Sequence, residues 1–374
     1  MRLLDRYLLR EFLVPLGYCL CGFLMFWIAS ELFSNLHQLQ DKHLQAADIA
    51  EYYLFRIPEF LPIVLPVSLL LALLYALTNH ARYHELTAIR AAGVSLWRLS
   101  LPYFAVGLAA GVCLFALDEF CAPRTSELAT QVLNRRVQRP VDAQDRDAVK
   151  NLDFQNARQA RNWHIGVYHR KSTEMSSVLV IWRLSDGTWR QLIAERARWT
   201  NGVWTFYGVT EIRQSESTNG LPVRVQFNEL PEPGFSESPD EIKSAISISE
   251  RFAHQARTKG ADLPISDILN YLRLNPEVKG ALRSWLFTKF NGRFAGPFTC
   301  VVVILIGVPF AAASGRRNVF VGVAASITIF FVYFLVQQFG LAFGEVGRVP
   351  AWLAAWLPNL AFGLVGLWMM SRVR

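Results

Sequence analysis

The residues that could do chemistry in this sequence gather in one short stretch, HARYHELTAIRAAGVSLWRL, which starts at His80. His80 and His84 are four residues apart, a spacing that places two imidazoles on one helix face, where they could share a metal ion. Glu85 follows directly, but there is no HExxH motif and no third ligand cluster. We therefore expect no metal site and interpret the pair as part of a solvated helix face.

Motifs for nucleotide binding and covalent catalysis are missing from the sequence as well. The nearest approach to a G-x-x-x-x-G-K-[ST] phosphate cradle, GVYHRKS from Gly166, lacks the glycine before Lys171. No G-x-S-x-G turn occurs, although the sequence leaves open a Ser-His-Asp triad assembled from distant positions. We expect this chain to bind no cofactor, so any energy from ATP must arrive through a partner.

The stretch around Glu85 lies between two long apolar runs of a chain that is apolar overall. Of its 374 residues, 52% are hydrophobic, and the mean hydropathy of +0.23 is too high for an ordinary soluble protein. A helix needs about 20 apolar residues to cross a hydrocarbon core. Six runs are predicted to do so, at residues 12–33, 57–78, 100–117, 285–313, 319–343 and 352–370.

The basic residues at the ends of these runs predict an orientation, because Lys and Arg in short loops are retained on the cytoplasmic side. One set of ends carries Arg2, Arg6, Arg10, Arg82, Arg90, Arg98, Arg316, Arg317, Arg372 and Arg374. The opposite short loops carry only Lys42, Arg56 and Arg348. Both termini are therefore predicted to be cytoplasmic, and the net charge of +8 reflects this asymmetry rather than nucleic-acid binding.

The polar middle of the chain has the period-two pattern of β-strands. Segments such as WHIGVYHR, SSVLVIWRL and VWTFYGVTEIR alternate apolar with polar residues. The pair Asn201-Gly202 is typical of a hairpin turn, since both residues tolerate positive φ. We expect an all-β domain, a sandwich, jelly roll or open barrel, at residues 135–260 on the periplasmic side; a folded spacer is the alternative. Membrane spans at 1–120 and 284–374 would flank it.

The stretch at residues 80–93 is predicted to form one helix that docks a cytoplasmic partner. Leu86 and Arg90 would lie on one face and Glu85 on the neighbouring face. Gly93 follows two alanines and can end the helix in a left-handed cap. A rigid helix joining two spans would pass a displacement to both of them. A helix lying on anionic lipid is the alternative.

Smaller patterns predict local packing. Gly107 and Gly111 form GLAAG within the third span, which indicates close approach of another helix. The segment PISDILNYLRL is predicted to form an amphipathic helix capped by Ser266, with Leu269 and Leu272 on one side.

Four stretches occur in an order and spacing that resembles the lipopolysaccharide-export permeases of the LptF/LptG (YjgP/YjgQ) family. They are LLDRYLLREF, IPEFLPIVLPVSLLLAL, HELTAIRAAGVS and VPAWLAAWLPNLAFGLVGLWMMSRVR. The resemblance covers essentially the whole chain, and the D-R-Y start and final span are nearer to the LptG branch than to the LptF branch.

The resemblance implies a permease subunit of an ABC transporter in the bacterial inner membrane. It implies pairing with a second LptF/LptG-type permease in a pseudo-symmetric heterodimer, driven by an LptB-type ATPase dimer that uses the ATP. Such a complex extracts lipopolysaccharide from the membrane, and a jelly-roll domain passes it to an LptC-like bridge protein toward the outer membrane.

The resemblance also implies roles for individual residues. Glu85 would be the acidic residue of the coupling helix, and Arg90 and Gly93 would be further contact positions for the ATPase. The first and fifth spans, residues 12–33 and 319–343, would form the lateral gate.

Lipid contacts are the place where the sequence departs from the family. LptG-type relatives tend to carry basic residues at the outer end of the first span, where this chain reads SELFSNLHQLQDKH. Lys42 or Arg56 would substitute as contacts for lipid phosphates, or the cargo would be less anionic. Arg293, near the start of the fourth span, is expected to face outward among the headgroups and retain an anionic lipid.

Two other classes of function are compatible with parts of this pattern. A membrane-embedded hydrolase or transferase would need clustered acids and histidines on the outer face, which the sequence does not display. A non-transporting membrane protein that couples a cytoplasmic ATPase to a periplasmic partner would share the same layout. The sequence does not specify the exact lipid, nor whether the chain takes the LptG or the LptF role.

Overall fold

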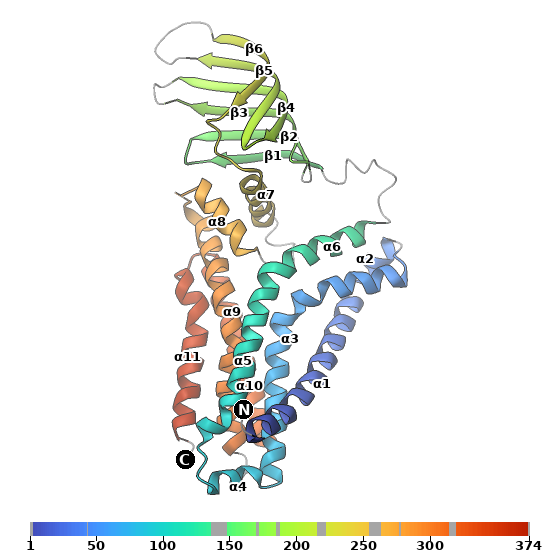
Figure 1. Cartoon of the computed structure of the whole chain (residues 1–374), viewed down its shortest axis with the longest axis vertical. Helices are drawn as coiled ribbons and strands as arrows, with labels where there is room; N and C mark the ends of the chain where they lie inside the picture. The colour runs from blue at the N-terminus through green and yellow to red at the C-terminus, as the bar shows by residue number, and fades with distance from the viewer. Residues whose placement is uncertain are drawn as a thin grey trace. The chain divides into compact units, whose positions relative to one another are not determined.

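The structure is a computed structural model that describes residues 3–42, 44–135, 148–169, 172–184, 188–214, 222–253, 263–276, 278–313 and 319–372. The chain forms two compact units, one helical and one built on a β-sheet (Figure 1). The helical unit combines the N-terminal and C-terminal parts of the chain, and the β unit is inserted between them.

The helical unit contains long apolar helices. In chain order its elements are α1 (Leu3–Ser34), α2 (Leu36–Asp41), α3 (Ala46–Arg82), α4 (Glu85–Ala91), α5 (Leu96–Ala116), a π-helical turn η1 (Leu117–Cys121), α6 (Ala122–Asn134), α9 (Gly280–Ala313), α10 (Val319–Glu345) and α11 (Ala351–Arg372). Within the described residues, six helices are long and apolar enough to cross a membrane. The predicted fold class, a six-span helical protein with an inserted β domain, is confirmed, although the inserted unit also contains helices.

The two ends of the helical unit differ in which elements they carry. Because the number of spans found in the described residues is even, the first span begins and the last span ends at the same end of the unit. The start of α1, the end of α11 and the short helix α4 lie toward one end, and α2 and α6 lie toward the other (Figure 1). We call these the α4 end and the α6 end. The third predicted span is longer than expected, because α5 continues through η1 into α6.

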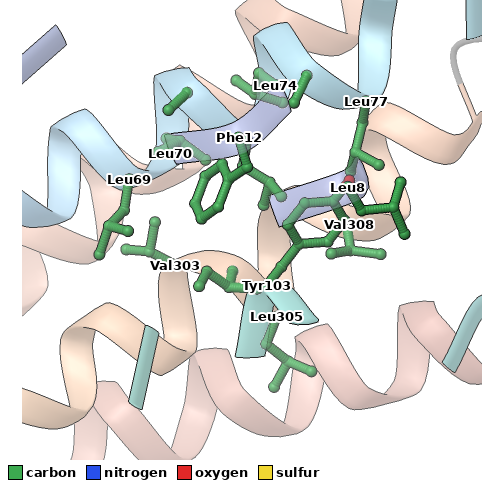
Figure 2. Close-up of a cluster of buried hydrophobic side chains, with 14 of the residues drawn as sticks. Leu8, Phe12, Leu69, Leu70, Leu74, Leu77, Tyr103, Val303, Leu305 and Val308 are labelled. Carbon is green, nitrogen blue, oxygen red and sulfur yellow. The ribbon is translucent and has the colours of Figure 1, made fainter. Parts of the chain in front are cut away.

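The core of the helical unit joins α1, α3, α5 and α9 (Figure 2). Phe12 of α1 meets Tyr103 of α5 edge to face, with ring centroids 5.2 Å apart. Gly111 of α5 lies against α9 so closely that a Cβ there would be 2.6 Å from the carbonyl oxygen of Pro297. A Cβ at Gly107 would be 3.2 Å from the carbonyl oxygen of Cys300. The predicted close packing at the two glycines is confirmed.

The β unit contains, in the part of the chain that the structure describes, one antiparallel sheet whose strands follow one another in chain order. The strands are β1 (Ala148–Asn156), β2 (Arg161–His169), β3 (Met175–Arg183), β4 (Trp189–Thr200), β5 (Val203–Gln214) and β6 (Val223–Glu232). Burial alternates along β2, as the period-two pattern predicts. The β4–β5 hairpin turns at Asn201 and Gly202, whose φ angles of 53° and 81° confirm the predicted turn.

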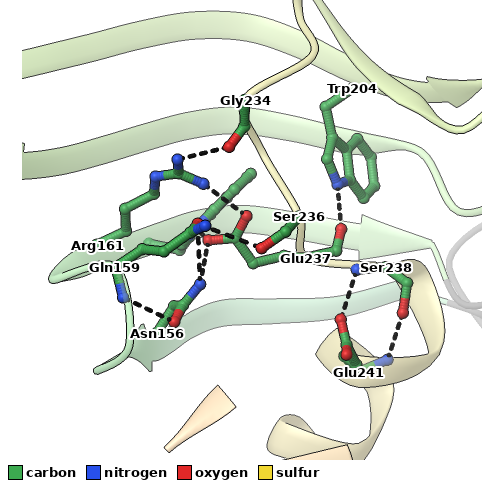
Figure 3. A network of polar contacts seen from close by, with 10 residues as sticks. Asn156, Gln159, Arg161, Trp204, Gly234, Ser236, Glu237, Ser238 and Glu241 are labelled. Atoms are coloured by element: carbon green, nitrogen blue, oxygen red, sulfur yellow. Dashed lines mark hydrogen bonds and ion pairs between the residues drawn. The ribbon is translucent and has the colours of Figure 1, made fainter. Parts of the chain in front are cut away.

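A buried polar network ties the start of the sheet to the segment that follows β6 (Figure 3). The carboxylate of Glu237, fully buried, accepts hydrogen bonds from Asn156 (2.8 Å), Arg161 (2.9 Å) and Trp163 (3.3 Å). Trp204 donates its indole N–H to the Glu237 carbonyl oxygen at 2.6 Å. Burial lowers the pKa of Arg161, and Glu237 opposes that shift.

Two helices complete the β unit, α7 (Pro239–Ala253) and α8 (Ile265–Leu274). The predicted cap at Ser266 is wrong, because α8 already begins at Ile265. Leu269 is 52% exposed, and Ile268 and Leu274 are the buried side chains instead. Tertiary contacts decide this face: Tyr271 packs on the sheet core, and the Leu274 carbonyl accepts the Arg158 N–H at 3.1 Å.

Candidate functional site

The connection between α3 and α5 consists of two helical pieces. α3 continues to Arg82, and His84 then adopts a left-handed φ of 59° before α4 starts at Glu85. The expectation of one helix over residues 80–93 is therefore wrong. The left-handed residue redirects the chain, so that α4 lies across the bundle at the end where α1 starts and α11 finishes (Figure 1).

The end of α4 follows the prediction for Gly93. Gly93 has φ +83° and donates its N–H to the Arg90 carbonyl at 3.0 Å, and the Val94 N–H reaches the Ile89 carbonyl at 3.3 Å. These two bonds are those of a Schellman motif, which needs a residue that tolerates the left-handed region. Ser95 then caps α5 by accepting the Arg98 N–H at 3.3 Å. The Schellman motif at the end of α4 and the Ser95 cap at the start of α5 fix the short link between the two helices, and so hold α4 in position.

The two faces of α4 differ in chemistry. Leu86 is 7% exposed and Ile89 packs beside it, both against the core of the helical unit. Thr87, Ala88 and Ala91 are exposed on the other side, where their side chains are small. An exposed surface of small side chains next to a buried anchor can accept another protein without disturbing the bundle.

Glu85 lies at the start of α4 and is held by two other helices. Its carboxylate oxygens lie 3.1 and 3.2 Å from the hydroxyl of Tyr7 in α1, and Oε2 lies 2.7 Å from Nδ1 of His80 in α3. The side chain remains 33% exposed. Close by, Arg98 at the start of α5 pairs with Asp5 of α1 at 3.0 Å. Reasoning on the sequence missed Asp5 and Tyr7, because nothing local relates them to residues about 80 or 90 positions later.

At the α6 end, Arg56 is engaged by acidic side chains of its own chain. Its guanidinium pairs with Glu31 of α1, bonds Glu59 at 2.9 Å, and donates to the Tyr52 hydroxyl at 2.9 Å. Only 12% of the Arg56 side chain is exposed. Lys42, directly after α2, is partly exposed. The charge of Arg56, one of the two residues predicted to meet lipid phosphates here, is neutralised within the fold.

Arg293 does not face outward as expected. It is 7% exposed, donates from Nε to the Leu263 carbonyl at 3.1 Å, and places Nη1 3.9 Å from Asp118 of η1. Its neighbour Lys289 pairs with Glu345 of α10 at 2.9 Å. Because a charged side chain is costly in hydrocarbon, burial beside a carboxylate and a carbonyl satisfies the guanidinium inside the bundle.

These charges line a cavity of about 160 Å³ between α3, α5 with η1, α9 and α10. The hydroxyl of Thr288 also lines it, is fully buried, and has no hydrogen-bond partner among the described residues. The cavity is large enough for several water molecules or a small polar group. Its residues come from four separate segments, so no spacing in the sequence could have revealed it.

Two of the apolar helices, α1 and α10, are far less covered than the others. In the most apolar 18 residues of each helix, 6% are buried in α1 and 11% in α10, against 61% in α3 and 67% in α9. Large apolar side chains project from both, including Met25 and Phe26 on α1 and Phe331 and Phe339 on α10. An open groove of about 660 Å³ runs between α1 and α3. These faces are available to lipid or to another helical protein.

α10 is nevertheless fixed to its neighbours by a buried polar chain. The Tyr333 hydroxyl donates to the Asn359 side chain at 2.6 Å and shares a hydrogen bond with Thr299 at 2.8 Å. Asn359 in turn donates to the Ala295 carbonyl at 2.8 Å. One face of α10 is thus tied to α9 and α11, while the other is exposed.

Comparison with known proteins decides the family. The family model "Lipopolysaccharide export system permease LptF/LptG" matches residues 6–372. The chain belongs to the LptF/LptG family. A curated relative, the lipopolysaccharide export system permease protein LptG of Haemophilus influenzae, is 24% identical over 327 residues, covering 85% of this chain and 84% of the relative.

Membership in the LptF/LptG family agrees with the six apolar helices and the inserted sheet. The chain is a multi-pass membrane protein and a permease for lipopolysaccharide export, a transport protein rather than an enzyme.

Proposed function

We propose that this chain is the permease subunit of an ABC transporter that extracts lipopolysaccharide from the bacterial inner membrane and passes it toward the outer membrane. ATP would be hydrolysed by a separate LptB-type ATPase dimer. The observation that carries the proposal is α4, a capped helix between two spans with a buried anchor at Leu86 and an exposed face of small residues.

The proposed ATPase site is the exposed face of α4 together with Glu85, Arg90 and Gly93. A partner can approach Thr87, Ala88 and Ala91 closely, since none carries a bulky side chain. Glu85 keeps a third of its surface exposed and can offer its carboxylate to a basic residue of the partner. The proposed orientation in the membrane places α4 and both termini in the cytoplasm and the β unit in the periplasm.

The proposed path for lipid runs along the exposed faces of α1 and α10, which form a gate with a second LptF/LptG-type permease. The poor coverage of these two helices supports this role, because a gate helix must separate from its neighbours without exposing a packed core. The Tyr333 chain would keep α10 aligned with α9 and α11 while its free face opens.

Lys42 stays a proposed contact for lipid phosphates, and Arg56 is no longer proposed as one. Glu31 and Glu59 already neutralise Arg56, so its role is to hold the end of α1 against α3. Arg293 would act inside the cavity, where it keeps a polar environment between α9 and η1.

The proposed exit is the edge of the β-sheet. β6 is an edge strand of the described sheet, with Val223, Val225 and Phe227 exposed. Such a strand can pair with a strand of an LptC-like bridge protein and extend the sheet.

The docking proposal is tested by copurification with the tagged ATPase encoded in the same organism. Ala88→Trp adds bulk to the exposed face of α4 without touching the core, so ATPase recovery should fall at least about tenfold, equivalent to about 1.4 kcal/mol. Leu128→Trp, on an exposed position of α6, is the matched control and should recover wild-type amounts. Full recovery with Ala88→Trp would contradict docking at α4.

A further inference from the structure

Two stretches of the sequence, LLDRYLLREF at the start of α1 and HARYHELTAIRAAGVSLWRL around α4, meet in the structure. Tyr7 contacts Glu85 at the first residue of α4, and Asp5 contacts Arg98 in the first turn of α5. The start of α1 thus touches both sides of the α3–α5 connection. The Tyr7 contact involves Glu85, which belongs to the proposed ATPase site, whereas the contact of Asp5 with Arg98 lies outside that site.

The contacts are specific in geometry. The Tyr7 hydroxyl lies 3.1 and 3.2 Å from the two Glu85 oxygens, and His80 approaches Oε2 at 2.7 Å from the opposite helix. The rings of Tyr7 and His80 are 5.5 Å apart. His80 is 1% exposed, so one side of the Glu85 carboxylate is fixed by a side chain that solvent cannot displace.

Asp5 and Tyr7 project in different directions from the same helix. Residues two positions apart in an α-helix are separated by about 200° around the axis. The side chains of Asp5 and Tyr7 therefore reach different partners. Contacts on two sides restrain rotation as well as translation of α1. The fully buried residues of α1, Leu8 and Phe12, lie within the next two turns.

We infer that Asp5 and Tyr7 are positioning residues which, through Arg98 and Glu85, clasp α1 to the α4 connection. Displacement of α4 is thereby passed directly to α1, a helix that few other buried contacts restrain, as well as through α3 and α5. This inference deepens the proposed function and rests on it for the source of the displacement. It gives the D-R-Y start of the chain a mechanical role.

The clasp itself is tested on the full chain in nanodiscs, without any partner. Spin labels introduced as noncanonical amino acids at Leu3 and Thr87, both exposed, report the distance between α1 and α4. The double variant Asp5→Asn with Tyr7→Phe should broaden the distance distribution at least about twofold. Tyr207→Phe, in β5, is the control and should match wild type. An unchanged distribution in the double variant would overturn the clasp.

Charge complementarity is tested on the same labelled chain. Asp5→Arg alone should broaden the distribution, and Asp5→Arg combined with Arg98→Asp should narrow it again. Broadening that persists in the exchanged pair would overturn the ion pair as the source of the restraint.

Transmission is tested on the complex with its ATPase in vesicles. The double variant should keep ATP hydrolysis within about twofold of wild type, while lipid released per ATP falls at least about fivefold. Unchanged release per ATP would overturn transmission through the clasp and leave the proposed function intact. Failure of the wild-type chain to bind the ATPase would overturn the proposed function, and the label distances would still decide whether the clasp exists.

Discussion

Gly111 offers the sharpest test of the packing that keeps the bundle rigid enough to pass on a displacement. A Cβ at this position would lie 2.6 Å from the Pro297 carbonyl oxygen, a backbone atom that cannot rotate away. An ordinary C···O contact is about 3.3 Å, so α5 and α9 must separate by roughly 0.7 Å. Overpacking lowers the free energy of unfolding by about 1–3 kcal/mol. The higher helix propensity of Ala than of Gly raises it by up to about 1 kcal/mol.

Gly111→Ala should therefore destabilise the chain by about 1–2 kcal/mol, which for 374 residues lowers the melting temperature by roughly 1–3 °C. The measurement is thermal unfolding of the purified full chain in detergent, followed by intrinsic fluorescence. Gly22→Ala in α1 is the matched control, because a Cβ there meets nothing within 4 Å. A Gly111→Ala chain that melts at or above the temperature of wild type would refute the close approach of the two helices.

Three further predictions concern the β unit and α10. Glu237→Gln removes the charge opposite buried Arg161 and should lower the free energy of unfolding of the β unit by about 3 kcal/mol. Amide hydrogen exchange in β2 should then be roughly a hundredfold faster, and an acceleration below threefold would contradict the prediction. Burial opposes ionisation of Glu211, but hydrogen bonds from Arg213 and Arg190 outweigh it and hold the Glu211 pKa below its usual 4.5. The stability that ionised Glu211 contributes to the β unit is therefore complete above pH 4.5, and it declines as the pH falls through the lower pKa that Glu211 has in the folded state. Glu211→Gln should remove that part of the acid sensitivity of β-unit melting, and an equal decline in both chains would exclude Glu211 as its source. Tyr333→Phe breaks the link from α10 to α11 and should cost about 1 kcal/mol; an unchanged unfolding midpoint would show that the link is dispensable.

Features set by local chemistry could be predicted from the sequence. Six spans follow from the length of apolar runs, and the β4–β5 turn follows from Asn201-Gly202, two residues that both tolerate positive φ. Gly93 likewise ends α4 because a Schellman motif needs a left-handed residue. Each of these choices is made by a few neighbouring residues.

Features set by distant partners could not be predicted in this way. His84 adopts a left-handed conformation that the helical pattern around it does not predict, where the chain turns toward the contacts of Glu85 with Tyr7 and His80. Arg293 is buried because Asp118, far away in the chain, lies beside it. The candidate site is therefore an assembly in which the sequence gives the chemistry of single residues and the fold decides which of them remain exposed.

The central claim is that α4 faces the cytoplasm, where an ATPase can reach it. The most direct measurement is thiol labelling of Thr87→Cys, on the exposed face of α4, with a membrane-impermeant maleimide read by peptide mass spectrometry. We expect labelling in inverted inner-membrane vesicles and none in spheroplasts, with the reverse result for Arg198→Cys on the exposed face of β4. Labelling of Thr87→Cys in intact spheroplasts would place α4 outside the cytoplasm, where the ATPase cannot reach it, and would contradict docking at α4.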